Sequence, residues 1–296
     1  MQTVYERINQ NKTSSVILIV LFFIIISALG YLFGVYFRFP IFGLAFAFII
    51  STAMALFSFY DGDSVALSLS GAKAATKKQY PEFYNTVEGL SIAAGLQMPK
   101  LYVIEENSIN AFATGRDPKH ASLAVTTGAL KKLKRVELEG VVGHEMSHIK
   151  NYDIRMMMLV MVLVGVIAML SDMMLRTFMY GRGDRDRDKG GGILIIVGLA
   201  LAILAPIIAQ LIKFAISRKR EFLADADGAL LTRYPAGLAS ALTKIKNDDD
   251  KIVDAANKAT AHLFIENPLR AHEGWLNSLF DTHPPIDARI KALKAM

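Results

Sequence analysis

The 296-residue chain contains no cysteine. Disulfide bonds and thiolate metal ligands are therefore excluded, which is compatible with a domain in the reducing cytoplasm. Histidine is scarce as well, with six residues in the whole chain. Two histidines at the spacing of metal ligands are for that reason informative.

Charged residues are missing from two long stretches near the N-terminus, residues 13–37 and 39–60. Each stretch is longer than the roughly 20 residues that a membrane-spanning helix needs. Only Arg38 separates them, and the first exceeds the roughly 7 to 15 residues of a signal-peptide core. The sequence therefore predicts an uncleaved membrane hairpin over residues 1–60.

A second apolar pair lies in the middle of the chain, at residues 156–171 and 193–212. The loop between them contains a run at 181–189 in which arginine and aspartate alternate, so the loop is expected in water. The pair predicts a second hydrophobic hairpin over 156–217. Whether each run crosses the bilayer fully stays open, because the first is short and is followed by Asp172.

The sequence HEMSH at 144–148 places two histidines and a glutamate on one helical turn. His144 and His148 are four residues apart, so both imidazoles lie on one helix face and can converge on one ion. Glu145 lies one step round the helix, from where it can act as general base on the water molecule that the metal activates. This pattern is typical of zinc peptidases.

The residues that lead into this motif predict a helix. An apolar stripe is expected on one of its faces, with Glu137 and Glu139 on the other. The stripe comprises Val136, Leu138, Val141 and Val142.

A catalytic zinc site needs a third protein ligand. The metzincin pattern would require glycine at position 151 and histidine at 154, where this chain has Asn151 and Ile154. The better candidate is Glu221, which shares a predicted helix face with Asp225. We expect Glu221 to bind the metal and Asp225 to accept the second N–H of a ligand imidazole.

The two halves of this site flank the second apolar pair. His148 and Glu221 must lie on the same side of the membrane, so an even number of crossings separates them. Both are within ten residues of an apolar run, which predicts a metal site close to the membrane surface. This position suits a protease whose substrates are membrane proteins.

Basic residues predict the orientation in the membrane. Arg7 and Lys12 precede the first span, and three lysines follow the second, which favours a cytoplasmic N-terminus and a cytoplasmic metal domain. The loop at 176–189 carries five basic residues and argues the other way. The net charge of +6 is interpreted as contact with anionic lipid headgroups, with no nucleic-acid partner.

Around the motif the pattern predicts a helix from Pro81 to about residue 94 and strands at 101–104 and 122–126. The second strand is either an edge to which an extended substrate adds or an ordinary internal strand. Residues 107–115 are expected to form a tight loop near the site.

Towards the C-terminus the pattern predicts helices at 236–246 and 251–263, and a last helix with Ile286, Ile290 and Leu293 on one face. His283 precedes two prolines that hold it in a rigid, extended segment. It is either a donor to the oxyanion of peptide hydrolysis or a helix-entry histidine bonded to the backbone. His120, His262 and His272 are interpreted as surface residues.

Four segments of the chain resemble the HtpX family of membrane zinc metalloproteases, relatives of the CaaX prenyl endopeptidases. They are HEMSH at 144–148, REFLADADG at 220–228, NAFATG at 110–115 and THPP at 282–285. The resemblance covers essentially the whole chain. It implies a mainly α membrane protein with a gluzincin-like α+β protease domain and a small sheet, divided between residues 61–155 and 218–296.

The resemblance also implies the activity: a zinc endopeptidase of the bacterial cytoplasmic membrane, with one zinc ion, that removes misfolded or damaged membrane proteins. His144, His148 and Glu221 match the metal ligands, and Glu145 matches the catalytic acid and base. Asn110 and His283 fall where relatives bind substrate or stabilise the intermediate.

Two other functions stay open. One is prenyl-protein processing, which shares the chemistry but not the substrate. The other is a membrane zinc-binding scaffold without hydrolysis, against which Glu145 argues, because a structural zinc site needs no additional carboxylate beside its ligands. Substrate specificity and oligomeric state are not indicated by the sequence.

Overall fold

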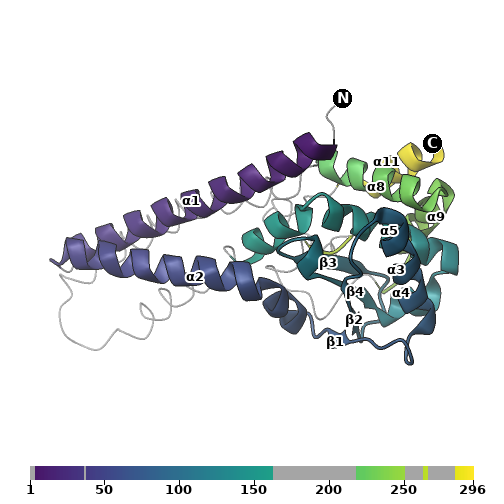
Figure 1. Cartoon of the computed structure of the whole chain (residues 1–296), viewed down its shortest axis with the longest axis horizontal. Coiled ribbons are helices and arrows are strands. Elements are labelled where there is room, and N and C mark those ends of the chain that lie inside the picture. The colour runs from purple at the N-terminus through teal and green to yellow at the C-terminus, as the bar shows by residue number, and fades with distance from the viewer. Residues whose placement is uncertain (1–3, 37, 163–217, 251–262, 266–283) are drawn as a thin grey trace.

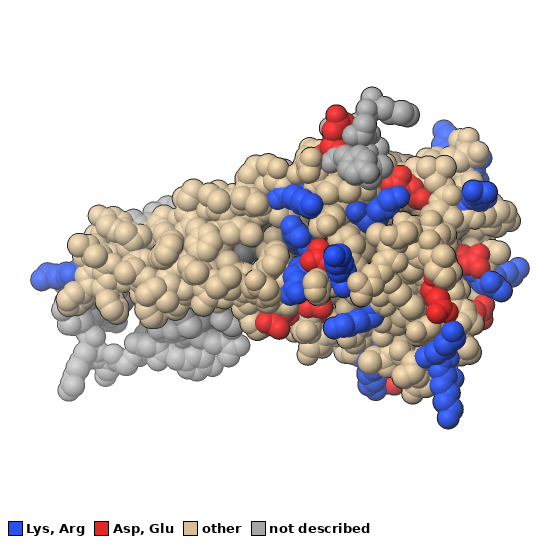
Figure 2. Space-filling view, in the orientation of Figure 1, with Lys and Arg blue, Asp and Glu red and all other residues tan. Residues whose placement is uncertain are grey.

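Two long helices extend from a compact body in the computed structural model (Figure 1), which describes residues 4–36, 38–162, 218–250, 263–265 and 284–296. Helix α1 (Val4–Tyr36) and helix α2 (Pro40–Leu69) run antiparallel and side by side. Both contain stretches long and apolar enough to cross a membrane, Ile8–Ala28 and Pro40–Leu69. Figure 2 shows the projecting pair almost free of charge except at its tip. The two predicted N-terminal spans are confirmed as membrane-length helices.

Glycines allow α1 and α2 to approach closely near their tip. A Cβ added at Gly43 would lie 2.4 Å from the carbonyl oxygen of Gly30, and one added at Gly30 would lie 2.2 Å from the Cβ of Ala47. Small residues at such a crossing let two helix backbones pack directly, which is a common way for apolar helices to associate in lipid. The two helices are thus packed as a hairpin, as the sequence predicts.

The body contains a four-stranded mixed sheet in the order β1-β2-β4-β3. Its strands are β1 (Lys73–Ala74), β2 (Lys100–Ile104), β3 (Ala111–Gly115) and β4 (Ala121–Thr126). Strands β2 and β4 are parallel, whereas β1 and β3 pair antiparallel with their neighbours. The predicted strands at 101–104 and 122–126 are confirmed.

Two details of the sheet were not determined by the sequence. Of the two alternatives left open for 122–126, the structure shows the internal strand, because β4 lies between β2 and β3 and all its residues are buried. The expected loop at 107–115 is wrong in its second half, which forms β3. Small residues allow both tight turns and buried strands, so the local sequence did not distinguish them.

The helices of the body pack around one core. Helix α5 (Arg135–Lys150) lies at its centre and packs against β3 and three helices. Those helices are α3 (Pro81–Ala94), α8 (Arg218–Thr232) and α9 (Pro235–Lys246). Helix α11 (Ile286–Lys294) packs against α8 and α9. Two short helices, η1 (Pro118–His120) and α4 (Thr127–Lys132), flank β4. A further helical stretch begins at Asp153 and is described to residue 162.

The helices predicted at 81–94, at 236–246 and at the C-terminus are confirmed. Pro81 opens α3 and Gly95, with φ of 64°, ends it. On α11, Ile286 and Leu293 are buried and Ile290 is partly buried. The predicted helix at 251–263 and most of the second apolar pair lie outside the described residues.

The sides of α5 differ from the predicted ones at its first turn. Val136 is 44% exposed, whereas Glu137 is 3% exposed. The Glu137 carboxylate accepts the Lys134 N–H at 2.6 Å, Lys244 Nζ at 2.6 Å and Ser240 Oγ at 2.7 Å. The prediction that Val136 belongs to the apolar stripe and Glu137 to the opposite side is therefore wrong at this turn, because Glu137 is buried and its hydrogen bonds join the start of α5 to α9.

Glu137→Gln should lower the free energy of unfolding by about 2 kcal/mol at pH 7, since hydrogen bonds to a charged group are lost. Burial alone would raise the pKa of Glu137, but Lys244 and the other donors outweigh it and hold the pKa below its usual 4.5. A depressed pKa stabilises the fold above pH 4.5, and this contribution is lost as the pH falls through the folded-state value. Thermal unfolding should therefore show the two proteins converging in acid; a gap independent of pH would contradict the prediction.

Candidate metal centre

Close packing of α5 against α8 brings the two sequence motifs together. A Cβ added at Gly228 would lie 2.8 Å from the backbone nitrogen of His144 and 2.9 Å from the carbonyl carbon of Gly143. Gly228 is therefore required for the helix backbones to touch at this crossing. The HEMSH helix and the helix that carries Glu221 can then share one site, although 72 residues separate His148 from Glu221 and 163–217 lie outside the described part.

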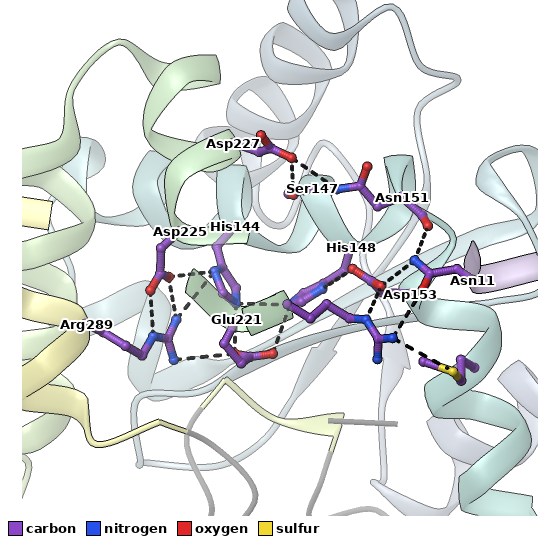
Figure 3. Close-up of polar contacts among 12 residues, drawn as sticks. Asn11, His144, Ser147, His148, Asn151, Asp153, Glu221, Asp225, Asp227 and Arg289 are labelled. Carbon is purple, nitrogen blue, oxygen red and sulfur yellow. Dashed lines mark hydrogen bonds and ion pairs between the residues drawn. The ribbon is translucent and has the colours of Figure 1, made fainter. Parts of the chain in front are cut away.

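His144, His148 and Glu221 form a buried cluster, and one ligand atom from each lies within 4.8 Å of the others. The two imidazole Nε2 atoms are 3.2 Å apart. The Glu221 carboxylate oxygens lie 3.7 Å from Nε2 of His144 and 3.6 Å from Nε2 of His148. Figure 3 shows the two rings and this carboxylate directed at one another. The structure thus brings together the three predicted ligands.

Each imidazole uses its other nitrogen for a carboxylate. Nδ1 of His144 lies 2.9 Å from Asp225 Oδ1, and Nδ1 of His148 lies 3.0 Å from Asp153 Oδ2. A carboxylate accepts, so each Nδ1 donates and each Nε2 of the neutral ring presents a lone pair. Two lone pairs and a carboxylate that face one point are the donor set of a divalent cation such as zinc, and the site fits a metal on this ground.

Two supporting residues were missed by the sequence analysis. Asp153, which is 1% exposed, takes the position at His148 that Asp225 has at His144. Arg289, with no exposed surface, donates to both Asp225 oxygens at 2.8 and 2.7 Å and to the Ile265 carbonyl at 3.1 Å. A signal for Arg289 existed, because it lies on the same face of the last helix as Ile286 and Ile290.

The carboxylates change the proton affinities of the site. Burial alone would lower the pKa of His148, but Asp153, Glu221 and Glu145 outweigh it and raise the pKa from 6.5 to about 9. Burial opposes ionisation of Asp225 as well, yet Arg289 and His144 outweigh it and lower its pKa to about 2. The site is therefore an environment that favours positive charge.

Glu145 lies beside this cluster and is 2% exposed. Burial raises the pKa of its carboxyl group, although the two histidines and an N–H from Ala113 of β3 act in the opposite direction. A carboxyl group with a raised pKa is suited to exchange protons near neutral pH. The edge strand β3 thus touches the predicted catalytic residue directly.

Further residues singled out in the sequence are Asn110, His283 and His120. Asn110 is buried at the start of β3, three residues from Ala113, and its side-chain oxygen accepts the Ala111 N–H at 3.0 Å. His283 lies outside the described residues. His120 is half exposed and pairs with Asp117 at 2.9 Å, in agreement with its interpretation as a surface residue.

Gly228→Ala tests the helix crossing that builds the site. The new methyl group would meet the backbone of α5, so α8 must shift and carry Glu221 away from the histidines. We expect the free energy of unfolding to fall by about 1–3 kcal/mol and zinc affinity to fall with it. Gly89→Ala is the matched control, because nothing lies within 4 Å of a Cβ at that helical position. It should stabilise the protein by about 0.5–1 kcal/mol, and equal effects of the two variants in thermal unfolding would refute the close-packing argument.

Several known proteins are similar to this chain over most of its length. The sequence profile of peptidase family M48 matches residues 77–296. A "Protease HtpX homolog" from Dictyoglomus thermophilum is 47% identical over 99% of this chain and 95% of its own length. Proteins of the same name from Caldanaerobacter subterraneus subsp. tengcongensis and Streptococcus gordonii are 46% and 40% identical, each over at least 98% of both chains. The crystal structure of S. mikatae Ste24p matches with a TM-score of 0.47 and 18% identity, covering 90% of this chain and 61% of that one.

Fold, site and comparisons define a membrane metalloprotease with a possible metal-binding triad at His144, His148 and Glu221. The chain belongs to peptidase family M48 and, within it, to the HtpX proteases. The family resemblance stated from the sequence is confirmed.

Proposed function

We propose that the protein is a zinc-dependent endopeptidase that cleaves misfolded or damaged membrane proteins, with a gluzincin-like domain that holds one zinc ion between His144, His148 and Glu221. The observation that carries this proposal is the convergence of both Nε2 atoms and the Glu221 carboxylate on one point, with Glu145 beside them. Each ligand imidazole is fixed by its own carboxylate, as metal-binding histidines require.

A zinc ion at this point would polarise the peptide carbonyl and make water more acidic. Glu145 would take a proton from the attacking water and deliver it to the leaving amine. Asp225 and Asp153 would hold the rings of the two histidines in the correct tautomer. Asn110 and His283 are proposed to contact the substrate or the oxyanion; the position of Asn110 at the start of β3 supports this role.

The proposed substrate class rests on where the site lies. Helix α1 contacts the body at the HEMSH helix and at α8, so the metal site is near the base of the two membrane-length helices (Figure 1). Polypeptide leaving the bilayer would meet the site there. We propose the bacterial cytoplasmic membrane as the location, with the body on the cytoplasmic side. Basic residues at the start of α1 and after α2, among them Lys12 and Lys73, support this orientation, because positive charges beside membrane spans favour the cytoplasm.

The test uses the full chain purified in detergent. Zinc content is measured directly, and cleavage of casein and of an unfolded membrane protein is followed before and after metal removal by a chelator, with a prenylated peptide as the alternative substrate. Loss of cleavage on chelation and its return with one equivalent of zinc are expected. A protein that binds zinc and cuts neither substrate would be a scaffold, and one that cuts only a prenylated peptide would be a processing protease; either result would overturn the proposal.

A further inference from the structure

A polar side chain of α1 is buried near the N-terminal end of this helix, in the polar stretch that precedes its apolar run. Asn11 is 6% exposed, whereas its neighbours Asn9, Gln10 and Lys12 face outward. The segment Ile8–Ala28 is long and apolar enough to span a membrane. A buried amide is costly unless it is hydrogen-bonded, so its partners indicate what it does.

The side-chain amide of Asn11 bonds to three groups around the metal site. Its Nδ2 donates to the Asn151 carbonyl at 2.7 Å and to Asp153 Oδ1 at 2.8 Å. Its Oδ1 accepts from Arg220 at 3.1 Å. Asn151 ends the HEMSH helix and Arg220 precedes Glu221 in α8. The amide therefore joins a membrane-length helix to both helices that carry the proposed ligands (Figure 3).

Asp153 connects Asn11 to His148. One of its oxygens accepts His148 Nδ1 at 3.0 Å, while the other accepts Asn11 and Arg220 Nε, the latter at 2.7 Å. With both oxygens committed, the carboxylate has one orientation. That orientation fixes which nitrogen of His148 carries the proton and where Nε2 points.

A second contact holds α1 at the same junction. Tyr152, between Asn151 and Asp153, has φ of 60°, a left-handed conformation that is unfavourable for a bulky residue. The Lys12 ammonium group of α1 lies over the Tyr152 ring, 4.6 Å from its centre. Adjacent residues of α1 thus contact this strained turn, which sets the position of Asp153.

We propose that Asn11 is a positioning residue of the metal site, which acts through Asp153 on His148 and makes the N-terminal membrane helix a part of that site. The inference rests on the proposed function, because it takes His148 to be a metal ligand. A consequence is that displacement of α1 in the membrane weakens metal binding without touching any ligand.

The test measures the dissociation constant for zinc by competition with a fluorescent chelator, together with the thermal unfolding midpoint of the metal-free protein. The full chain is used in detergent. Asn11→Leu keeps a side chain of similar size at this buried position but removes all three hydrogen bonds. It should weaken zinc binding about tenfold, the lower range for residues that orient a metal ligand. Asn11→Asp keeps the size and removes the donors, so it should weaken binding at least as much. Asn9→Leu, on the exposed side of α1, should leave the dissociation constant unchanged.

A double-mutant cycle of Asn11→Leu with Asp153→Asn distinguishes a positioning role of Asn11 from a merely structural one. If Asn11 acts through Asp153, the effect of Asn11→Leu on zinc affinity should largely disappear in the Asp153→Asn background. A lower unfolding midpoint with an unchanged dissociation constant, or effects that add fully, would overturn the inference while the proposed function stands. Conversely, the predicted change in zinc affinity in a protein that cuts no substrate would support the inference and refute the proposed function.

Discussion

Replacement of Glu145 by Gln should reduce proteolysis by about 10²–10⁴-fold, the usual contribution of a positioned acid and base. The amide has nearly the same size and can still accept the Ala113 N–H, but it cannot take a proton from water. Because Glu145 is not among the three converging side chains, zinc content should stay at one per chain. The rate of cleavage of an unfolded substrate and the zinc content should be measured on the same preparation.

Glu139→Gln is the matched control for this result. Glu139 lies on the same helix, but it is partly exposed and pairs with Arg135 at 3.0 Å on the surface. Surface ion pairs contribute little, so both activity and zinc content should be unchanged. Loss of zinc in Glu145→Gln would show that Glu145 holds the site together, and residual activity near the native rate would exclude it as the base.

Replacement of Arg289 by Met should have the largest effect on stability. The guanidinium group is fully buried and is the main positive partner of Asp225, with two hydrogen bonds to it. Its removal leaves the Asp225 carboxylate buried without this positive partner, which should lower the free energy of unfolding by about 3–5 kcal/mol. Zinc affinity should fall too, because Asp225 orients His144. Thermal unfolding and chelator competition measure the two effects.

Three further variants test this reading of Arg289. Lys291→Met removes a positive charge from the exposed side of the same helix and should change little. Arg289→Lys keeps the charge but cannot bind both oxygens in parallel, so its effect should be intermediate. Adding Asp225→Asn to Arg289→Met should recover part of the lost stability, since the uncompensated charge is gone. A loss no greater than that of Lys291→Met would contradict the role of Arg289.

Several elements were predictable from the sequence because their signals are local. Two charge-free runs predicted α1 and α2, and Pro81 and Gly95 bounded α3. The spacing of His144 and His148 predicted that both imidazoles share a face of α5. These features follow from helical periodicity and from bilayer thickness, which act over a few residues or a single helix.

Sequence patterns predicted the wrong environment where a charged residue is buried. They predicted the wrong secondary structure where small residues fit both a loop and a strand. Glu137 was predicted on the side of α5 opposite the apolar stripe, but it is buried and hydrogen-bonded to Lys244 and Ser240 of α9. Residues 111–115 have no strong strand pattern, and pairing with β4 makes them a strand. In both cases the deciding partner comes from another part of the chain.

By itself, the sequence determined the membrane-length hairpin, the helix that carries two histidines and a glutamate, and the candidacy of Glu221 and Asp225. Only the tertiary structure showed that Asp153 orients His148, that Arg289 holds Asp225 across 64 residues, and that Asn11 reaches Asp153 across 142 residues. The physical reason is that spacing along a helix fixes which side chains share a face. Pairing of buried polar groups between distant segments, in contrast, is fixed by how the helices pack.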